Sequence, residues 1–310
     1  MVRKFWLVNP TNGERWDLTP ENKYATTGGC PIVNVKGLGY ASEVEKNQTG
    51  TDYVVTNITS KNVEITGKMY FYNDKHKERF MAFIGSLDTQ LEFHYSPDGR
   101  VKASDLISPS WYKMVILNIT IGEKNNLGIY EADVTMKTLS DVWKKDISVK
   151  TNDPKFIGEA HVYDYFYDYV YNGRETIACN ITNFGREIGC LIKIKNNDSK
   201  DFSNIEWYKE HIYVDNYGQT QSIYQKARFL VTLDTNYELQ VDSNNLTQRA
   251  EVKNYNNDSL INVINNQELS WDYINFIRLE HGENRIIFFT DNRDAISISV
   301  TYTLQSEIPY

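Results

Sequence analysis

The sequence has no long hydrophobic run. Its first apolar run, Phe5 to Val8, spans four residues, whereas a secretory signal needs an apolar stretch of about 7–15 residues and a membrane helix about 20. No stretch of either length appears later in the sequence. We therefore expect neither an export signal nor a membrane-spanning helix.

Cysteine is also scarce. The chain has three, Cys30, Cys179 and Cys190, and an odd number leaves at least one thiol unpaired. A bridge between Cys179 and Cys190 is compatible with this count. Free buried thiols fit better with a chain that lacks an export signal, so the expected folding compartment is a reducing cytoplasm.

Basic residues are fewer than acidic residues. Lys and Arg total 33 against 41 Asp and Glu, a formal charge of −8. A protein that coats nucleic acid needs a basic surface, so this class is disfavoured, although a local basic patch is not excluded. With 17 Gly and 7 Pro in 310 residues, the chain is neither collagen-like nor of low complexity.

The sequence lacks the common motifs for metal binding, nucleotide binding and nucleophilic catalysis. No HExxH or HxH pair, CxxC, Walker-type glycine loop or GxSxG elbow occurs. The polar run from Asn196 to Asp201 lacks the spaced bidentate Glu of a calcium loop. Asp and Glu are abundant, but nothing singles out a catalytic pair. We expect no enzymatic activity, no metal and no cofactor.

Period-two alternation of apolar residues dominates the sequence and predicts antiparallel strands with one packed face. The clearest examples lie at 63–71, 111–119, 130–137, 187–195, 223–233 and 295–304. One helix is expected after Asn73 or Asp74, because Phe80, Phe83, Ile84 and Leu87 fall at helical spacing. The predicted fold class is therefore mainly β with one helix.

Length and composition predict two domains. A chain of 310 residues exceeds the usual size of one domain. Asn, Asp and Pro cluster at 151–154, and the pattern beyond them is purely β. We expect a domain at 1–150, sandwich-like with one helix, and a two-sheet β-sandwich at 151–310.

A tyrosine ladder is the most unusual feature of the second half. Five tyrosines at alternate positions would project to one face of a strand: Tyr163, Tyr165, Tyr167, Tyr169 and Tyr171. Such a face can pack within a sandwich, bind a partner protein or stack on sugar rings. Packing is favoured, followed by a partner surface and then by a sugar platform.

The order of several N-terminal motifs resembles a known family. The hairpin motif Asn12-Gly-Glu-Arg-Trp-Asp-Leu18 is followed by Lys36-Gly-Leu-Gly39 and by a strand–helix–strand block at 63–95. This order is similar to that of the distal tail proteins of long-tailed, non-contractile bacteriophages. The strand count of the second half and its Phe184-Gly-Arg-Glu187 strand entry are compatible with the same family.

The resemblance implies a structural role at the virion tail tip, assembled in the host cytoplasm. The N-terminal domain would form a homo-hexameric ring that joins the tail tube protein to the tail-associated hub protein. A galectin-like C-terminal sandwich would anchor receptor-binding proteins. DNA would meet the protein only in transit, so the ring lumen is expected to be acidic or neutral, because a basic wall would bind phosphates.

The galectin resemblance does not extend to sugar binding. Trp207-Tyr-Lys-Glu210 matches the start of a galectin W-x-x-E-x-R strand, but Ile212 replaces its Arg. His281-Gly-Glu-Asn-Arg285 has the residues of the H-x-N-x-R strand, with Asn one place late. A shift of one residue moves a side chain to the opposite face of a strand. We expect no galectin sugar site, and a carbohydrate-binding module is the alternative function.

A candidate subunit-contact arm follows the glycine motif. Its residues are Gly37, Leu38, Gly39, Tyr40 and Tyr53. Strands are expected at 36–44 and 52–58, with a polar tip at 45–50. An isolated hairpin is at best marginally stable, so it would pack on a neighbouring subunit. The alternative is that it folds back onto its own sheet.

Overall fold

The structure is a computed structural model of residues 1–310. It describes residues 3–20, 29–39, 41–49, 51–61, 63–85, 89–97, 110–151, 156–159, 175–215, 217–290, 292–307 and 309. The chain forms two compact units, the first from Met1–Lys145 with Gln305–Tyr310 and the second from Asp146–Leu304. These described residues include no candidate for a membrane-spanning helix.

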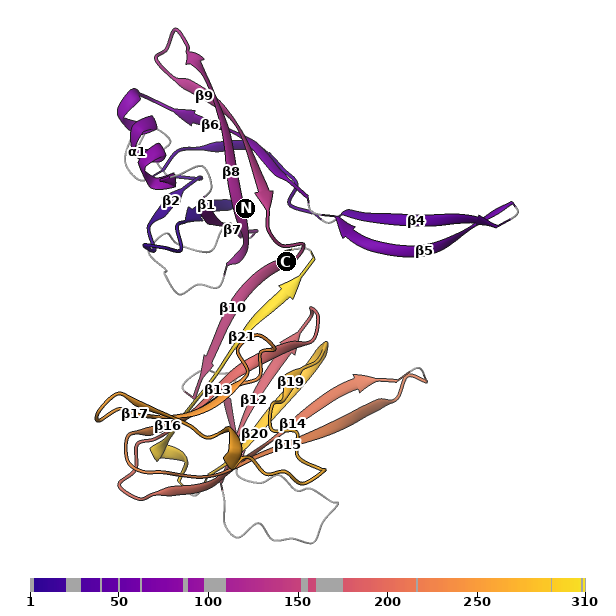
Figure 1. The fold of residues 1–310 in the computed structure, drawn as a ribbon, viewed down its shortest axis with the longest axis vertical. Coiled ribbons are helices and arrows are strands. Elements are labelled where there is room, and N and C mark those ends of the chain that lie inside the picture. Colours follow the sequence, from indigo (N-terminus) through magenta and orange to yellow (C-terminus); the bar gives the residue numbers. More distant parts are fainter. Residues whose placement is uncertain are drawn as a thin grey trace. The chain divides into compact units, whose positions relative to one another are not determined.

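Unit 1 is built on a branched antiparallel sheet (Figure 1). Its strands are β1 (Lys4–Val8), β2 (Arg15–Asp17), β3 (Ile32–Lys36), β6 (Ile65–Phe71), β7 (Gln90–Ser96), β8 (Trp111–Lys124) and β9 (Tyr130–Thr138). One arm runs β2–β1–β7–β8 and the other runs β3–β6–β9–β8. The start of β8 pairs with β7 and its later part with β9, so β8 joins the two arms.

The one helix of the described residues, α1 (Asp74–Ile84), confirms the prediction from spacing. Asn73 caps its start by accepting a hydrogen bond from the backbone N–H of His76, and Gly85 ends it at a positive φ of 75°. Phe80, Phe83 and Ile84 are buried. Phe80 packs at 5.2 Å from Trp16 between ring centroids. The helix therefore packs on the β1–β2 hairpin that the N-G-E-R-W motif predicts. Leu87 lies outside the described residues.

His76, in the first turn of this helix, has a buried, neutral imidazole. Its Nε2 lies 2.6 Å from the carbonyl oxygen of Gly29, and its Nδ1 faces the backbone N–H of Tyr72 at 3.5 Å. Nε2–H therefore donates and Nδ1 accepts, which leaves no place for a second proton. Burial lowers the pKa of His76 below its ordinary 6.5; the Gly29 contact raises it in part, and the nearby charge of Arg79 lowers it further.

Acidification is therefore expected to destabilise unit 1. Because the folded pKa of His76 is depressed, its stabilisation is complete above pH 6.5 and is lost as the pH falls through the folded value. Thermal unfolding between about pH 7.5 and pH 5, followed by tryptophan fluorescence, measures this loss. His76→Gln keeps a donor for Gly29 but does not titrate, so the stability of this variant should depend less on pH. If both proteins lose stability equally as the pH falls, titratable groups other than His76 cause the loss.

Unit 2 contains two antiparallel sheets. The first has the order β11 (Phe156–Glu159), β12 (Glu175–Asn183), β20 (Gly282–Thr290), β14 (Phe202–Val214) and β15 (Thr220–Leu233). The second has the order β18 (Ser259–Asn262), β17 (Arg249–Asn254), β16 (Tyr237–Asp242), β13 (Ile188–Asn196) and β21 (Ile296–Ser306). The short strand β19 (Arg278–Leu279) pairs with β13, and η1 (Ile264–Asn266) and η2 (Arg293–Ala295) are single 3₁₀ turns.

Aromatic and aliphatic side chains fill the core of unit 2. In the first sheet, Trp207 stacks on Phe229 with 5.7 Å between ring centroids. In the second, Ile192, Val241 and Val300 are buried. A mainly β fold with one helix is thereby confirmed, while the galectin-like character of the C-terminal part remains a prediction.

The chain passes between the units inside β10 (Trp143–Lys150). Lys144 of β10 pairs with Tyr112 of β8 in unit 1. Further along, Asp146 accepts a hydrogen bond from Thr303 of β21 in unit 2. The division thus falls at 145/146, and residues 305–310 return to unit 1, a return that the sequence did not suggest. The assignment of 1–150 as ring-forming and 151–310 as galectin-like remains a prediction.

Candidate functional site

The glycine motif marks a tight backbone crossing in unit 1. Gly37 has φ +83°, and a Cβ at this position would lie 2.0 Å from the carbonyl oxygen of Glu64. Only glycine fits both restrictions. Gly39 has open space around it, and Leu38 is half-buried. Gly37 therefore has a clear structural role, while Tyr40 lies outside the described residues.

A hairpin follows this crossing. Strands β4 (Ala41–Thr49) and β5 (Asp52–Lys61) pair antiparallel, with a bulge between Glu45 and Lys46. Figure 1 shows them as a separate two-stranded sheet, and among the described strands neither pairs with any other. The expected tip at 45–50 is wrong, because Thr49 pairs with Asp52 and the strands continue almost to the turn.

The side chains of this hairpin face solvent wherever the structure describes them. Val44 and Val55 are exposed, as are the residues 45–48, 51, 56 and 57. Tyr53 pairs with Gln48 through its backbone. A two-stranded hairpin is marginally stable alone in water, so this one has two open edges and little packing of its own. Its use between subunits stays a prediction.

The tyrosine ladder from Tyr163 to Tyr171 lies outside the described residues. None of its three interpretations is therefore tested. The nearest described strand after it is β12 of unit 2.

The tryptophan of the partial galectin motif is not available to a sugar. Trp207 is fully buried between Phe229 and Phe288, and its Nε1 has no hydrogen-bond partner among the described residues. A tryptophan that stacks on a sugar ring must expose one face of its indole. Trp207 therefore belongs to the core of unit 2.

The other motif residues also serve the local structure. Asn284 is buried and donates through Nδ2 to the carbonyl oxygens of Glu280 and Gly282, so it fixes the turn before β20. Arg285 faces Glu210 at 3.8 Å between Nη1 and Oε2. Tyr224 and Ser222 both donate to the same carboxylate. The polar groups of Glu210 are thus satisfied within the sheet.

A buried ion pair was not predicted from the sequence. The side chain of Lys209 has no exposed area, and its Nζ contacts the carboxylate of Glu280, which is 28 % exposed. Nζ also donates to the carbonyl oxygen of Arg278 at 2.7 Å. Burial lowers the pKa of Lys209, while the contact with Glu280 raises it in part. The signal in the sequence was a lysine on the same face as the core residue Trp207.

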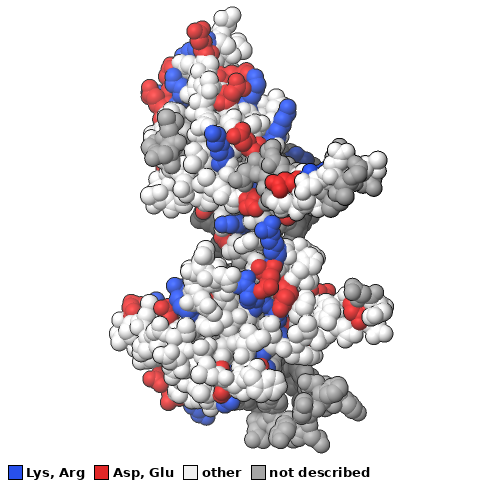
Figure 2. Space-filling model, turned by 45° about the vertical axis from the view of Figure 1, so that its right-hand side comes forward, with Lys and Arg blue, Asp and Glu red and all other residues white. Residues whose placement is uncertain are grey.

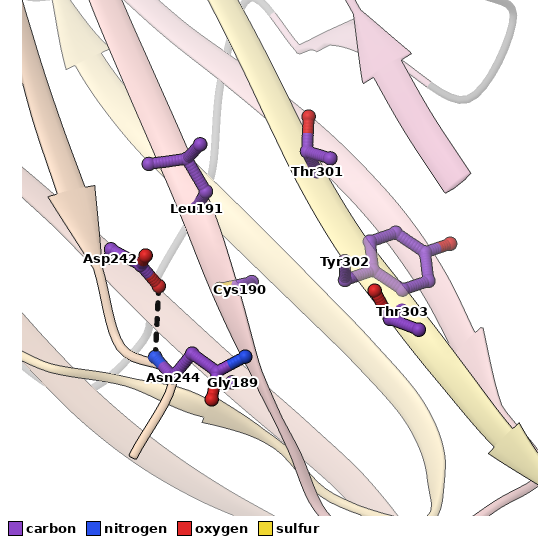
Figure 3. Close-up of a pocket in the computed structure, with 8 residues that line it drawn as sticks. All are labelled: Gly189, Cys190, Leu191, Asp242, Asn244, Thr301, Tyr302 and Thr303. Atoms are coloured by element: carbon purple, nitrogen blue, oxygen red, sulfur yellow. Dashed lines mark hydrogen bonds between the residues drawn. The ribbon is translucent and has the colours of Figure 1, made fainter. Parts of the chain in front are cut away.

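A shallow hollow lies on the second sheet of unit 2 (Figure 3). Its lining residues are Gly189, Cys190, Leu191, Asp242, Asn244, Thr301, Tyr302 and Thr303. The carboxylate of Asp242 accepts hydrogen bonds from the backbone N–H of Asn244 at 3.0 Å and from Thr247 Oγ1 at 2.7 Å. A Cβ on Gly189 would lie 2.6 Å from Asn244, so this glycine is required by close packing.

The described surface shows mixed charge. On the face in Figure 2, Lys and Arg side chains are interspersed with Asp and Glu. Pairs such as Lys124 with Asp74, 3.0 Å apart, explain part of this pattern. Among the described residues, no three His, Cys, Asp or Glu side chains gather as a metal site would require.

A known family matches the N-terminal part of the chain. Residues 4–139 match the family described as "Distal tail protein, N-terminal domain". This segment contains the hairpin motif, the glycine motif and the strand–helix–strand block that carried the resemblance. No curated protein sequence matches the chain significantly.

Solved structures from phages share the fold. The Dit protein (gp 19.1) of phage SPP1 is similar at 14 % identity, with a TM-score of 0.52 over 99 % of this chain and 100 % of that chain. A chain of the phage P2 baseplate in its activated conformation with Ca is similar at 13 % identity, with a TM-score of 0.51 over the same shares. The corresponding baseplate with Sr gives 11 % identity and 0.51. At such identities the likeness shows the fold alone.

Proposed function

We propose that this chain, whose residues 4–139 form the N-terminal domain of a distal tail protein, builds a hexameric ring at the tip of a phage tail. The coarser assignment, a structural protein of the phage tail tip, rests on that family match and on the fold shared with phage tail components. The match over 4–139 is the observation that carries the proposal.

The β4–β5 hairpin is the element that closes the ring in this proposal. A ring needs a heterologous contact, in which one surface of a subunit meets a different surface of the next. The hairpin offers open strand edges and exposed Val44 and Val55. Adding a strand to the sheet edge of a neighbour would satisfy both the backbone groups and these side chains. Gly37 would set where the hairpin leaves the sheet.

Unit 2 then carries the outward contacts. The ring would join the tail tube protein to the hub protein, and unit 2 would anchor receptor-binding proteins. The burial of Trp207 disfavours galectin-type sugar binding at this position. The Tyr163–Tyr171 ladder would serve packing or a protein partner in this scheme.

DNA would pass through the ring without binding to it. A channel wall rich in Lys and Arg would release counterions from the phosphates and hold the DNA in place. The formal charge of −8 and the interspersed charges of the described surface fit a weakly interacting wall. A continuous Lys/Arg belt around the bore of an assembled ring would contradict this part of the proposal.

Sizing of the purified protein tests the ring directly. We expect multi-angle light scattering to give a particle six times the 36.1 kDa of one chain, and negative-stain images to show a ring. If the free protein is a monomer, isolated tails are labelled with an antibody against the chain and imaged. We then expect the label at the tail tip. Tails without label at the tip would refute the assignment.

A further inference from the structure

A serine, a histidine and a glutamate form a hydrogen-bonded series in unit 1. Nδ1 of His94 lies 2.8 Å from Oγ of Ser110, and Nε2 of the same ring lies 2.9 Å from Oε2 of Glu92. Both distances fall within the range of about 2.6–3.2 Å at which a nucleophile, its base and the group that orients the base normally meet. The series therefore has the order of a catalytic triad, hydroxyl to imidazole to carboxylate.

Strand pairing brings these three residues together. Glu92 and His94 are two residues apart on β7, so their side chains share one face of the sheet. Ser110 directly precedes β8, whose first residue, Trp111, pairs with Tyr95. The three residues belong to no linear motif, because a strand ladder and not a nucleophile elbow places the hydroxyl beside the imidazole.

The imidazole of His94 is held from both faces. Trp6 of β1 stacks on it with 5.3 Å between ring centroids and an interplanar angle of 13°, and Tyr112 of β8 stacks on it at 5.3 Å and 26°. Both aromatic residues are direct cross-strand neighbours of His94, on the two sides of β7. This packing limits rotation of the ring and keeps its two nitrogens directed at their partners, as a preorganised base requires.

The hydrogen bonds determine which nitrogen of His94 carries the proton. The ionised carboxylate of Glu92 can only accept, so Nε2 carries a hydrogen and donates it. In the neutral ring Nδ1 is then the acceptor, and the hydroxyl of Ser110 is its donor. The free base therefore faces the proton that Ser110 must lose in order to attack a substrate.

Limited exposure restricts the class of substrate. Ser110 is 9 % exposed, and the side chains of His94 and Glu92 are 14 % and 26 % exposed. A short acyl group can reach such a hydroxyl, whereas a polymer cannot lie across it. Esters are favoured over amides, since an alkoxide is a better leaving group than an amide anion. We identify no oxyanion hole among the described residues, and such a hole contributes about 10²–10³ in rate, so slow acylation is expected.

We propose that Ser110 is a nucleophile that accepts an acyl group from small esters, with His94 as its general base and Glu92 as the residue that positions His94. Oγ of Ser110 bonds to the carbonyl carbon while its proton passes to Nδ1 of His94. The bond from that carbon to the alcohol oxygen then breaks, and the leaving oxygen takes the proton from His94. The products are acyl-Ser110 and the free alcohol. This proposal does not depend on the ring.

Labelling of the purified full-length chain with a small alkyl fluorophosphonate tests the nucleophile. The serine oxygen displaces fluoride and forms a stable phosphonate ester, so the product accumulates. We expect peptide mass spectrometry to find the label on Ser110. In the matched control Ser140→Ala, which removes a half-buried serine that donates to Val142, this label should persist. A parent protein without label on Ser110, or with equal label on Ser140, overturns the proposal.

The rate of acylation tests the base. We expect His94→Gln to lower the rate at which p-nitrophenyl acetate acetylates Ser110 by about 10²-fold or more, the usual contribution of a general base. His211→Gln changes a buried histidine of unit 2 and should leave the rate unchanged. Melting temperatures show whether each variant is folded. An unchanged rate in folded His94→Gln, or acetyl groups found only on residues other than Ser110, overturns the proposal.

Proton NMR of the unmodified protein tests the positioning role of Glu92 without any substrate. A histidine ring N–H that donates to a carboxylate resonates far downfield of the amide signals. We expect one such signal, which stays in Ser110→Ala and moves toward the amide region in Glu92→Gln. Glu14→Gln changes an exposed carboxylate of unit 1 and should not affect it. The absence of this signal, or its persistence unchanged in Glu92→Gln, refutes the positioning role.

Discussion

Replacement of the hairpin at 41–61 by a short Gly-Ser linker is expected to leave unit 1 folded and to abolish ring formation. Among the described strands, β4 and β5 pair only with each other, so their loss removes no ladder from the main sheet of unit 1. The backbone edges they offer to a neighbour are lost altogether. Light scattering should then give a monomer slightly lighter than the 36.1 kDa parent chain. Thermal unfolding should give a melting temperature close to that of the parent protein.

Removal of the other projecting hairpin gives the matched control. A linker in place of residues 213–222 shortens β14–β15 in unit 2 and should leave the rings intact, because these residues lie outside the segment 4–139 that matches the distal tail protein family. Intact rings after loss of 41–61 would exclude the subunit-contact arm. A protein that no longer folds would instead favour the alternative in which the hairpin supports its own sheet.

Glu280→Gln is expected to cost about 3 kcal/mol of unfolding free energy, because it leaves the ammonium group of Lys209 buried without a counterion. This value lies at the lower end of the range for broken buried pairs, since Glu280 keeps 28 % exposure. Urea denaturation followed by tryptophan fluorescence reports the change, with Trp207 two positions from Lys209 on the same face of β14.

Two variants separate this effect from simple loss of charge. Glu283→Gln changes an exposed carboxylate on β20 and should alter the stability by less than about 0.5 kcal/mol. Lys209→Met in the Glu280→Gln background replaces the unpaired charge by an apolar chain of similar length and should restore most of the loss. If Glu280→Gln is as stable as the parent, the ion pair does not stabilise the contact between β14 and the turn before β20.

Local patterns in the sequence predicted much of the fold. Alternation identified the long strands because a buried face places an apolar residue at every second position, as in β8 and β21. The helix followed from the spacing of Phe80, Phe83 and Ile84. The ends of β4 and β5 were misplaced because a hairpin with little burial carries no alternation to mark where its strands stop.

Features that depend on distant pairing could not be predicted. The return of 305–310 to unit 1 and the contact of Lys209 with Glu280 join segments far apart in the chain. The exposure of Trp271 could not be predicted, because only the structure shows which tryptophans are exposed to solvent. The absence of a galectin sugar site stays a prediction, and the burial of Trp207 agrees with it at that one position.

The passage of the chain through β10 and back at the end of β21 makes unit 2 an insertion within unit 1. Both junctions lie on strands, and the segments on either side of the inserted part belong to one unit. Recombination at these two points would exchange the whole of unit 2 while unit 1 kept its own connections. A lineage that carries this architecture could replace unit 2 as one cassette without redesigning unit 1.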